Sequence, residues 1–357
     1  MQPSRDTFRL FGINGSMSYA KKVADHLGVP LIPIREKQFS DGEVMACPDE
    51  NVRGCDCYFI LDPYSDPKMT VNDKIMMAFV FIDALRRASA RSVIWVKRPP
   101  AYDRQDRKTK PREPVTTGMM GKLLDSLYLD RLITLDPHSL VATNNMLRRG
   151  NVDVLQARQV MADAIVAYID NPDDLVIQAP DEGAVNRHVK PARKSLEKRL
   201  SAKFGKEIRI PMTYFDKEHA EDQEEVTGDL IIGDVKGKKV IVWDDMFGTG
   251  GTVDINRRAI EVNGGKLYIA VATHGYFTMK KNRSADQNFD GVEHIFITDS
   301  MDGETPWRLD PVKMDGEGRK LAKSFLDRLH VVDTSKFMAE VLWETDNGGS
   351  INKLLQD

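Results

Sequence analysis

The fold of this chain is decided by the stretch KKVIVWDDMFGTGGTVDINRRAIEV, residues 238–262, with KLYIAVATH at 266–274. Residues 238–245 form a β-branched run of strand length, and residues 251–262 place apolar side chains at helical spacing. A second apolar run of strand length follows at 266–274. The order strand, helix, strand is typical of a parallel sheet that is covered by helices.

The same alternation extends outward from this stretch in both directions. We expect further strands at residues 8–13, 29–34, 57–62, 92–96, 131–136, 174–179 and 294–299. We expect helices at residues 18–27, 72–88, 119–127 and 160–169. The pattern restarts after Asn151, so we predict an α/β protein of two Rossmann-like domains with mainly parallel sheets, arranged in tandem. The predicted limits are 1–155 for the first domain, 156–330 for the second, and 331–357 for a closing strand and helix segment.

The composition is that of an ordinary globular protein, with 41% hydrophobic and 29% charged residues in 357. The 51 Lys and Arg residues and 54 Asp and Glu residues give a formal net charge of −3. This balance excludes nucleic-acid binding through bulk positive charge, but not a local basic surface.

The three cysteines and the N-terminus both indicate a reducing compartment. Cys47, Cys55 and Cys57 are odd in number, and their spacing fits no zinc signature, so we expect free thiols. The N-terminal stretch lacks the apolar core of a signal peptide, and no segment approaches the length of about 18 apolar residues that a membrane helix needs. We expect a soluble, cytoplasmic protein without a membrane partner.

The sharpest chemical signal is DDMFGTGGT, residues 244–252, between the expected strand and helix. Glycines let backbone N–H groups approach a phosphate, and a helix N-terminus adds favourable partial charge. The hydroxyls of Thr249 and Thr252 can donate to the same anion, while Asp244 and Asp245 suit vicinal sugar hydroxyls or a hydrated magnesium ion. The loop is not a Walker A motif, because no Lys follows its glycines. The other interpretation is a plain glycine-rich turn.

Two stretches depart from the average charge. Residues 96–112 hold seven Lys or Arg and two Asp, a local net charge of +5. Residues 216–229 hold seven acids and one Lys, a local net charge of −6. A charge run is usually a solvated surface, but the prolines, Tyr102 and Gln105 in the basic run argue against a plain solvated helix.

The loop DDMFGTGGT resembles the ribose-phosphate binding loop of phosphoribosyltransferases, and above all that of ribose-phosphate diphosphokinases, also called phosphoribosyl pyrophosphate synthetases. Further segments resemble that family in the same order along nearly the whole chain. They are FSDGEV (39–44), ENVRG (50–54), VNDKIMMAFVFIDALRRASA (71–90), YDRQDRKTKPREPVT (102–116), LITLDPHS (132–139), GDVKGKKVIVWDDM (233–246) and ATHGYF (272–277).

The resemblance implies two phosphoribosyltransferase-like domains and magnesium-dependent transfer of the β,γ-diphosphate of ATP to the 1-hydroxyl of ribose 5-phosphate, which releases AMP. It also implies a homo-oligomer built from dimers, such as a hexamer. Such a reaction needs a positioned hydroxyl and cations that neutralise a triphosphate.

The resemblance assigns site residues by role. The ATP site takes Phe39, Asp41, Glu43, Arg104, Gln105, Asp106, Arg107 and Arg112, with Phe39, Asp41 and Glu43 reaching the adenine from a neighbouring subunit. The acceptor ribose phosphate takes Asp244, Asp245, Phe247, Gly248, Thr249, Gly250, Gly251 and Thr252. His138 and Asp181 are the metal ligands, and Lys217, His219 and Arg107 are the catalytic residues. The alternative for Phe39 is a core aromatic.

Several departures from the family pattern concern the acceptor half. Gly248 stands where the family usually has Asp, and His219 stands where it has Arg. A basic stretch at 186–209, with nine Lys or Arg against two Glu, either replaces the missing cations or forms a solvated helix. Residues 301–329 match no family segment. Trp307 and Arg308 there either face a ligand or pin the insertion to the core, and the core is the better default for a lone Trp.

These departures leave three hypotheses. The first is transfer to ribose 5-phosphate. The second keeps the chemistry but uses a larger acceptor such as ADP-ribose, in NAD metabolism, for which Gly248 leaves room. The third is a non-catalytic regulatory paralogue, against which the retained charged site residues argue.

Overall fold

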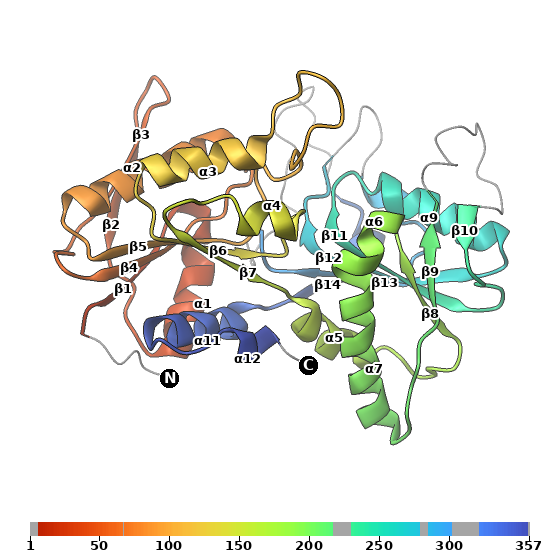
Figure 1. Cartoon of the computed structure of the whole chain (residues 1–357). Coiled ribbons are helices and arrows are strands. Elements are labelled where there is room, and N and C mark those ends of the chain that lie inside the picture. The colour runs from red at the N-terminus through yellow and green to blue at the C-terminus, as the bar shows by residue number, and fades with distance from the viewer. Residues whose placement is uncertain (1–5, 67, 217–229, 279–284, 302–320, 356–357) are drawn as a thin grey trace. The chain divides into compact units, whose positions relative to one another are not determined.

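The computed structural model describes residues 6–66, 68–216, 230–278, 285–301 and 321–355. The chain forms two compact units (Figure 1). The first unit holds the described residues up to Gln156, Ser300 with Met301, and the described residues from Asp333 onward. The second unit holds the described residues of Ala157–Asp299 and residues 321–332. Among the described residues, no helix has the length and apolar character to cross a membrane.

The first unit is built on a five-stranded parallel sheet in the order β1-β4-β5-β6-β7. Its strands are β1 (Phe8–Gly12), β4 (Asp56–Ile60), β5 (Ser92–Lys97), β6 (Arg131–Leu135) and β7 (Asn151–Leu155). Its helices are α1 (Met17–Leu27), α2 (Val71–Arg87), α3 (Thr116–Ser126), α4 (Leu140–Asn144), α11 (Ser335–Asp346) and α12 (Asn352–Leu355), with a 3-10 turn at Asn14–Ser16. A separate antiparallel hairpin joins β2 (Ile34–Gln38) to β3 (Val44–Pro48). Helices α2 and α3 cover one face of the sheet, and α1 and α11 cover the other (Figure 1).

Aromatic packing holds the first sheet to α2. The ring of Phe81 on α2 meets Phe11 and Phe59 edge-on, and Phe59 stacks on Trp95 of β5. All four rings are buried. Each such ring removes a large apolar area from water and prefers these offset or edge-to-face contacts. Thr70 precedes α2 and caps it: its hydroxyl accepts from the N–H of Asp73 in a capping box.

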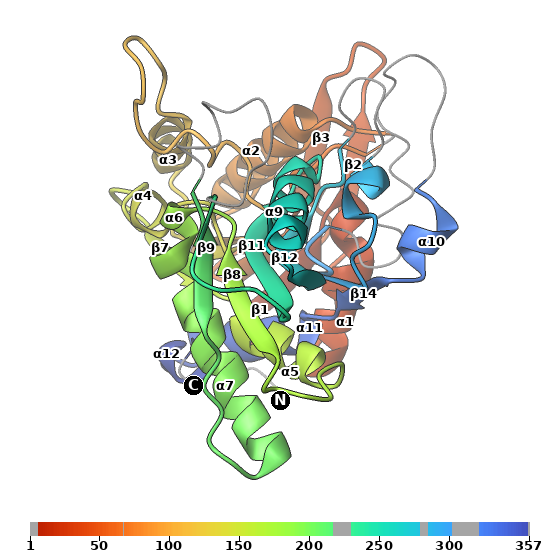
Figure 2. The same cartoon turned by 90° about the vertical axis from the view of Figure 1, so that its right-hand side faces the viewer.

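The second unit is built on a seven-stranded sheet in the order β10-β9-β8-β11-β12-β13-β14, parallel except for the pair β9 and β10. Its strands are β8 (Leu175–Ala179), β9 (Met212–Phe215), β10 (Ile231–Ile232), β11 (Lys239–Phe247), β12 (Lys266–Gly275), β13 (His294–Thr298) and β14 (Leu329–Val332). Its helices are α5 (Arg158–Val166), α6 (Glu182–Ala184), α7 (Lys190–Phe204), α9 (Gly251–Val262) and α10 (Lys323–Leu326), with a π turn at Val185–Val189 and a 3-10 turn at Ala285–Phe289. Helix α9 covers one face of this sheet, and α5 and α7 cover the other (Figures 1 and 2).

The strand predicted at residues 29–34 is wrong. There the chain forms only a single bridge between Leu31 and Leu10, and β2 begins at Ile34. Pro30 and Pro33 flank the bridge, and a proline cannot donate to a strand ladder. The predicted helix at the basic stretch exists as α7, and the described end of the predicted insertion forms α10 and β14.

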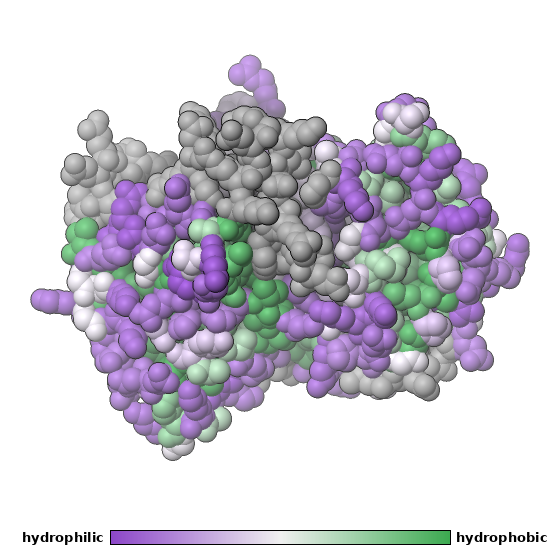
Figure 3. All heavy atoms as spheres, turned by 180° about the vertical axis from the view of Figure 1, so that it is seen from behind, coloured by the Kyte–Doolittle hydropathy of each residue, from purple (hydrophilic) through white to green (hydrophobic). Residues whose placement is uncertain are grey.

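Several large apolar side chains, such as those of Tyr128 and Val141, are exposed on the described surface. On the face drawn in Figure 3, hydrophilic residues surround scattered hydrophobic ones. Such single exposed apolar side chains are normal for a folded protein. The described structure therefore directs attention to its loops at the ends of the strands.

Candidate functional site

The hairpin of β2 and β3 exposes the first three predicted ATP-site residues at its tip. The N–H of Phe39 donates to the carbonyl of Glu43 at 2.8 Å, and Gly42 closes the turn with a φ of 95°. Phe39 keeps 40% of its surface exposed, so the core interpretation of this ring is wrong. Asp41 and Glu43 are exposed beside it. An exposed ring next to two hydrogen-bond acceptors has the chemistry to stack on a nucleobase.

The basic loop, residues 98–115 between β5 and α3, is anchored at its base by buried ion pairs. Lys97 Nζ lies 3.2 Å from the carboxylate of Asp103, and both side chains are buried. Arg98 Nε donates to Asp62 Oδ2 at 3.0 Å, again between two buried groups. Because loss of one partner would leave a buried charge uncompensated, these pairs hold the base of the loop to the sheet.

Beyond this base the basic loop presents its cations to solvent. Arg104, Arg107 and Arg112 are exposed, with the exposed Gln105 and the half-buried Asp106 between the first two. A planar guanidinium binds phosphate oxygens in a bidentate fork. Several such groups on one loop give a surface suited to a polyphosphate.

The tip of the basic loop is shaped by Glu113. Its carboxylate accepts from the hydroxyl of Thr109 at 2.8 Å and from the N–H of Lys110 at 2.8 Å. These hydrogen bonds, the Thr109 hydroxyl first, lower the pKa of Glu113. The carboxylate of Glu113 is therefore used to fold this turn.

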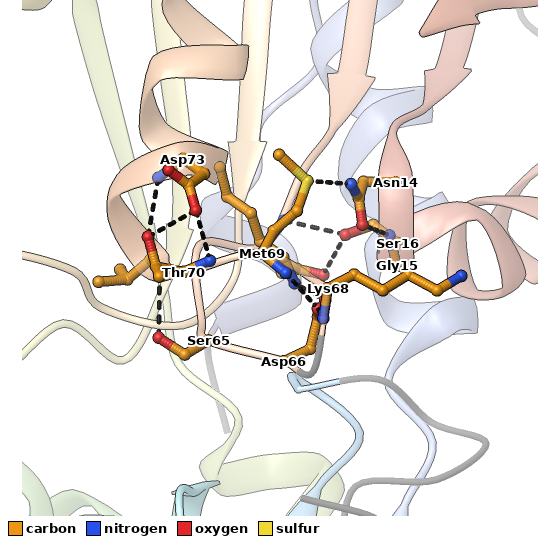
Figure 4. A network of polar contacts seen from close by, with 12 residues as sticks. Asn14, Gly15, Ser16, Ser65, Asp66, Lys68, Met69, Thr70 and Asp73 are labelled. Carbon is orange, nitrogen blue, oxygen red and sulfur yellow. Dashed lines mark hydrogen bonds and ion pairs between the residues drawn. The ribbon is translucent and has the colours of Figure 1, made fainter. Parts of the chain in front are cut away.

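A polar network that the sequence did not single out lies at the carboxyl ends of β1 and β4 (Figure 4). Asp66 Oδ1 accepts from the N–H of Met69 at 2.9 Å, and Met69 Sδ is contacted by the amide of Asn14. The buried Lys74 lies 2.6 Å from Asp66. Burial raises the pKa of Asp66, but the hydrogen bond and charge of Lys74 outweigh this and lower it overall. These contacts hold together the loop that follows β1 and the loop that follows β4. Strand β4 pairs with β5, from which the basic loop starts.

His138 follows β6 in the first unit and is half-buried. The next residue, Ser139, caps α4 by accepting from the N–H of Ala142 at 3.4 Å. Asp136 takes a φ of 35° just before it, and its N–H donates to Leu155 at 2.9 Å. The turn that positions the imidazole is thus tied to the neighbouring strand β7.

The acceptor loop, residues 248–250 between β11 and α9, requires glycine at one position. Gly250 has a φ of 78°, and a Cβ there would lie 2.7 Å from the ring of Phe289 and 2.9 Å from Asn288. Only glycine tolerates both the left-handed backbone and this approach. Gly248 differs, because a Cβ there would meet no atom within 4 Å.

The carbonyl groups of the acceptor loop are held by residues that follow it in sequence. The N–H of Thr278 donates to Gly248 at 3.0 Å, and the amide of Asn288 donates to Thr249 at 2.7 Å. With these carbonyls engaged, the loop leads directly into the N-terminus of the twelve-residue α9. A glycine-rich loop at a helix N-terminus is a favourable place for a phosphate.

Asp244 and Asp245 lie near the carboxyl end of β11, just before this loop. The N–H of Asp245 donates to Asp244 Oδ1 at 2.9 Å. Burial, the adjacent charge of Asp245 and the more distant charge of Asp181 raise the pKa of Asp244 well above its usual range. A carboxylate in this state is stabilised by hydroxyl donors or by a cation. The buried ring of Phe247 follows and packs edge-on against Phe289.

Asp181 follows β8 in the second unit. Its Oδ1 accepts from the N–H of Ala184 at 2.8 Å, and Arg187 approaches it at 4.0 Å. Its assignment as a metal ligand stays a prediction. Within the described parts of the chain, no three His, Cys, Asp or Glu side chains gather into a metal cage. His138 and Asp181 belong to different units, and each is described within its own unit.

Two of the predicted catalytic residues, Lys217 and His219, lie outside the described residues. Arg107, the third, is described and exposed on the basic loop. The sequence did not point to Asn288 as a partner of the acceptor loop, since the two lie 39 residues apart.

Comparisons with known proteins identify relatives along this chain. A family model described as the N-terminal domain of ribose phosphate pyrophosphokinase matches residues 8–127. The ribose-phosphate pyrophosphokinase of Bacillus subtilis is 32% identical over 329 residues, covering 90% of this chain and 94% of that protein. The ribose-phosphate pyrophosphokinase of Parasynechococcus marenigrum is 30% identical over 363 residues, covering 100% of this chain and 96% of that protein. The crystal structure of phosphoribosylpyrophosphate synthetase from Mycobacterium smegmatis matches with a TM-score of 0.75 and 26% identity, covering 96% of this chain and 100% of that chain.

These matches confirm the predicted family and the α/β fold with mainly parallel sheets. The two bacterial relatives align with 90% and 100% of this chain, so the similarity extends over both units. The chain belongs to the ribose-phosphate pyrophosphokinase family and is a pyrophosphotransferase.

Proposed function

We propose that this enzyme transfers the β,γ-diphosphate of ATP to the 1-hydroxyl of ribose 5-phosphate in a magnesium-dependent reaction, and releases AMP. The observation that carries the proposal is the acceptor loop, in which a glycine-only turn at Gly250 and two preceding carboxylates lead into α9. In this reaction an oxygen of the acceptor forms a bond to the β-phosphorus of ATP, while the bond from that phosphorus to the α-phosphate oxygen breaks. The 1-hydroxyl releases its proton to solvent, and the electron pair of the broken bond leaves on the α-phosphate oxygen of AMP.

The acceptor half follows from the chemistry of the loop. The N–H groups at the start of α9 and the hydroxyls of Thr249 and Thr252 suit the 5-phosphate, which carries the charge that a helix N-terminus favours. Asp244 and Asp245 suit the vicinal ring hydroxyls, because each hydroxyl donates to a carboxylate. Such donors stabilise the ionised carboxylate against the burial and the neighbouring charge of Asp245 that raise the pKa of Asp244.

The ATP half follows from the basic loop and the hairpin. Arg104, Arg107 and Arg112 suit the phosphate oxygens, and the exposed ring of Phe39 suits the adenine. We assign Arg107, with Lys217 and His219, to stabilise the charge that develops on the transferring diphosphate. Preorganised cations of this kind contribute strongly to phosphoryl transfer.

The donor set of His138 and Asp181 is compatible with magnesium. Asp181 keeps one carboxylate oxygen beyond the one that caps α6. Magnesium prefers a few protein ligands and takes its remaining oxygens from water and substrate phosphates. When bound, it neutralises triphosphate oxygens; the residues of the chain bind and orient the two substrates.

We infer that the protein acts as a homo-oligomer built from dimers. The hairpin tip around Phe39 is exposed in a single chain, and an adenine site completed by a neighbouring copy would cover it. The oligomeric state is measured by light scattering with and without ATP.

A second candidate acceptor is ADP-ribose. It is favoured by Gly248, where the family resemblance leads us to expect an aspartate and where the structure leaves open space next to the acceptor loop. ADP-ribose keeps a free 1-hydroxyl on its distal ribose, and the chemistry at the β-phosphorus is the same. The product would be ADP-ribose pyrophosphate.

An acceptor screen tests the proposal. Purified enzyme is incubated with ATP and magnesium and with ribose 5-phosphate or ADP-ribose, and AMP is followed by mass spectrometry. We expect AMP and a pyrophosphorylated product with ribose 5-phosphate. If AMP forms with ADP-ribose but not with ribose 5-phosphate, ADP-ribose is the acceptor. If neither acceptor increases the formation of AMP, the proposed function is wrong.

A further inference from the structure

Three buried polar side chains form a hydrogen-bonded ladder inside the second unit. Thr213 on β9 donates its hydroxyl hydrogen to Gln178 Oε1 at 3.2 Å. Gln178 on β8 donates from Nε2 to Asn256 Oδ1 of α9 at 2.6 Å. The exposed fractions are 2% for Thr213 and 0% for Gln178 and Asn256. Thr213 and Gln178 are register partners on neighbouring parallel strands, so both side chains lie on the face of the sheet that α9 covers.

The ladder ends on the backbone of the candidate site. Asn256 Nδ2 donates to the carbonyl oxygen of Thr252 at 2.9 Å. Thr252 is the second residue of α9 and the last residue of the glycine-rich motif. Gln178, the middle residue of the ladder, lies three residues before Asp181. Two elements that each lead into the site are thus linked through one buried amide pair.

The donors in the ladder all point the same way. Thr213 donates to Gln178, Gln178 donates to Asn256, and Asn256 donates to Thr252. Each amide is therefore fixed in one orientation, since a flipped amide would place like groups against each other. Hydrogen bonds in such a chain polarise and strengthen one another in a low-dielectric interior.

We propose that Asn256 and Gln178 are positioning residues for the acceptor phosphate, and this inference rests on the proposed function. They fix the first turn of α9 relative to β8, so that the N–H groups at its start and the Thr252 hydroxyl meet the ligand without reorganisation. A displacement of about 1 Å at such a site costs about a hundredfold in rate. Sequence spacing hides this role, because Gln178 and Asn256 are 78 residues apart.

A purely structural role makes a different prediction. If the ladder only satisfies buried polar groups, removing one member destabilises the fold but leaves the affinity of the folded protein for its acceptor unchanged. Replacing two partners by apolar groups of similar shape is nearly neutral for stability. The double variant Gln178→Met with Asn256→Leu removes both amides together and leaves only the Thr213 hydroxyl without its acceptor, so it separates positioning from most of the stability cost.

The chain offers a matched control on the same helix. Asn263 Nδ2 donates to the carbonyl of Ala259 at 2.9 Å, the same side-chain bond to the residue four positions earlier, at the opposite end of α9. Asn263→Leu removes this bond far along the helix from Thr252. Wild type, Asn256→Leu, the double variant and Asn263→Leu are compared by calorimetry with ribose 5-phosphate, by steady-state kinetics, and by hydrogen exchange of peptides covering residues 249–253.

In Asn256→Leu and the double variant we expect a rise of about tenfold in the dissociation constant and KM for ribose 5-phosphate. We expect the KM for ATP to stay within about twofold, and exchange at 249–253 to become faster. Asn263→Leu should behave as wild type in the calorimetry, the kinetics and the hydrogen exchange. Unchanged ribose 5-phosphate affinity in the double variant, with slow exchange at 249–253, would overturn the inference.

Failure of the proposed function gives a different pattern. Wild-type protein would then bind no ribose 5-phosphate, whereas faster exchange at 249–253 in Asn256→Leu, and not in Asn263→Leu, would still support the positioning role for the loop. Equal exchange in wild type and Asn256→Leu would overturn that role whichever acceptor is used.

Discussion

The basic loop and the acceptor loop both suit phosphate, but they are built in opposite ways. The basic loop is long, is held by buried ion pairs only at its base, and exposes the guanidinium groups of Arg104, Arg107 and Arg112. The acceptor loop is three residues long, and its carbonyls are engaged by Thr278 and Asn288. The basic loop offers charged side chains, and the acceptor loop offers oriented backbone N–H groups.

The difference suits the two ligands that we propose. A triphosphate carries several charges, and several exposed guanidinium groups on one loop can bind its oxygens in bidentate forks. A sugar monophosphate must hold one hydroxyl in place for attack, which a rigid backbone cradle achieves. The comparison predicts that the two loops respond differently to substitution.

The largest effect is expected for Arg107→Ala. Loss of a cation that stabilises the transferring diphosphate should lower kcat by about a thousandfold, while the melting temperature stays unchanged because the side chain is exposed. Initial-rate kinetics and thermal denaturation measure both. The matched control is Lys122→Ala, an exposed cation on α3. A kcat within about threefold of wild type would remove Arg107 from the catalytic group.

The next effect is expected for Gly250→Ala in the acceptor loop. The left-handed φ and the overlap with Phe289 should raise the KM for ribose 5-phosphate by about a hundredfold. The control is Gly248→Ala, which meets no atom within 4 Å and should change KM little. Equal effects of the two substitutions would show that backbone geometry does not set acceptor binding.

A smaller effect is expected for Phe39→Ala on the hairpin. Loss of stacking on the adenine should raise the KM for ATP by about tenfold without changing the KM for ribose 5-phosphate. The ring is 40% exposed, so the fold should tolerate its loss. A parallel rise in both KM values would contradict an adenine contact.

The smallest effect concerns pH and Asp244. Its raised pKa means that the folded chain keeps a proton that the unfolded chain releases. The stabilisation from this proton is complete below the ordinary pKa of about 3.9 and is lost as the pH rises through the folded value. In Asp244→Asn, the melting temperature should therefore gain on wild type as the pH rises from the ordinary pKa of about 3.9 toward neutral. A constant difference in denaturation scans over this range would show that Asp244 is not protonated in the folded chain.

Much of this architecture was predictable from local pattern. The runs at β4, β5, β6 and β11 are β-branched or aromatic and lie between turn residues, so each indicates a strand without reference to the rest of the chain. The hairpin strand β2 reads IREKQ, and four of its five residues are exposed, so it carries no alternation that could reveal it.

The site was predictable only where a single segment carries it. The acceptor loop is one motif, and its glycines and carboxylates are visible in sequence. Its supports, Asn288 and Asn256, act through contacts with residues in other segments, which depend on the order of strands in the sheet. An isolated asparagine in a sequence does not indicate which carbonyl or amide it will meet.

The return of α11 to the first unit has a consequence for how the chain is made. Helix α11 packs on α1, and the hydroxyl of Tyr19 lies 3.0 Å from that of Thr334, so the first unit uses segments from both sides of the second. During synthesis, the apolar face of α1 stays uncovered until α11 leaves the ribosome, about 300 residues later. At about 5–20 residues per second, this delay is tens of seconds. A fragment that stops at Gln156 would keep that face open, so cutting the enzyme between its units should yield an aggregating half instead of an independent domain.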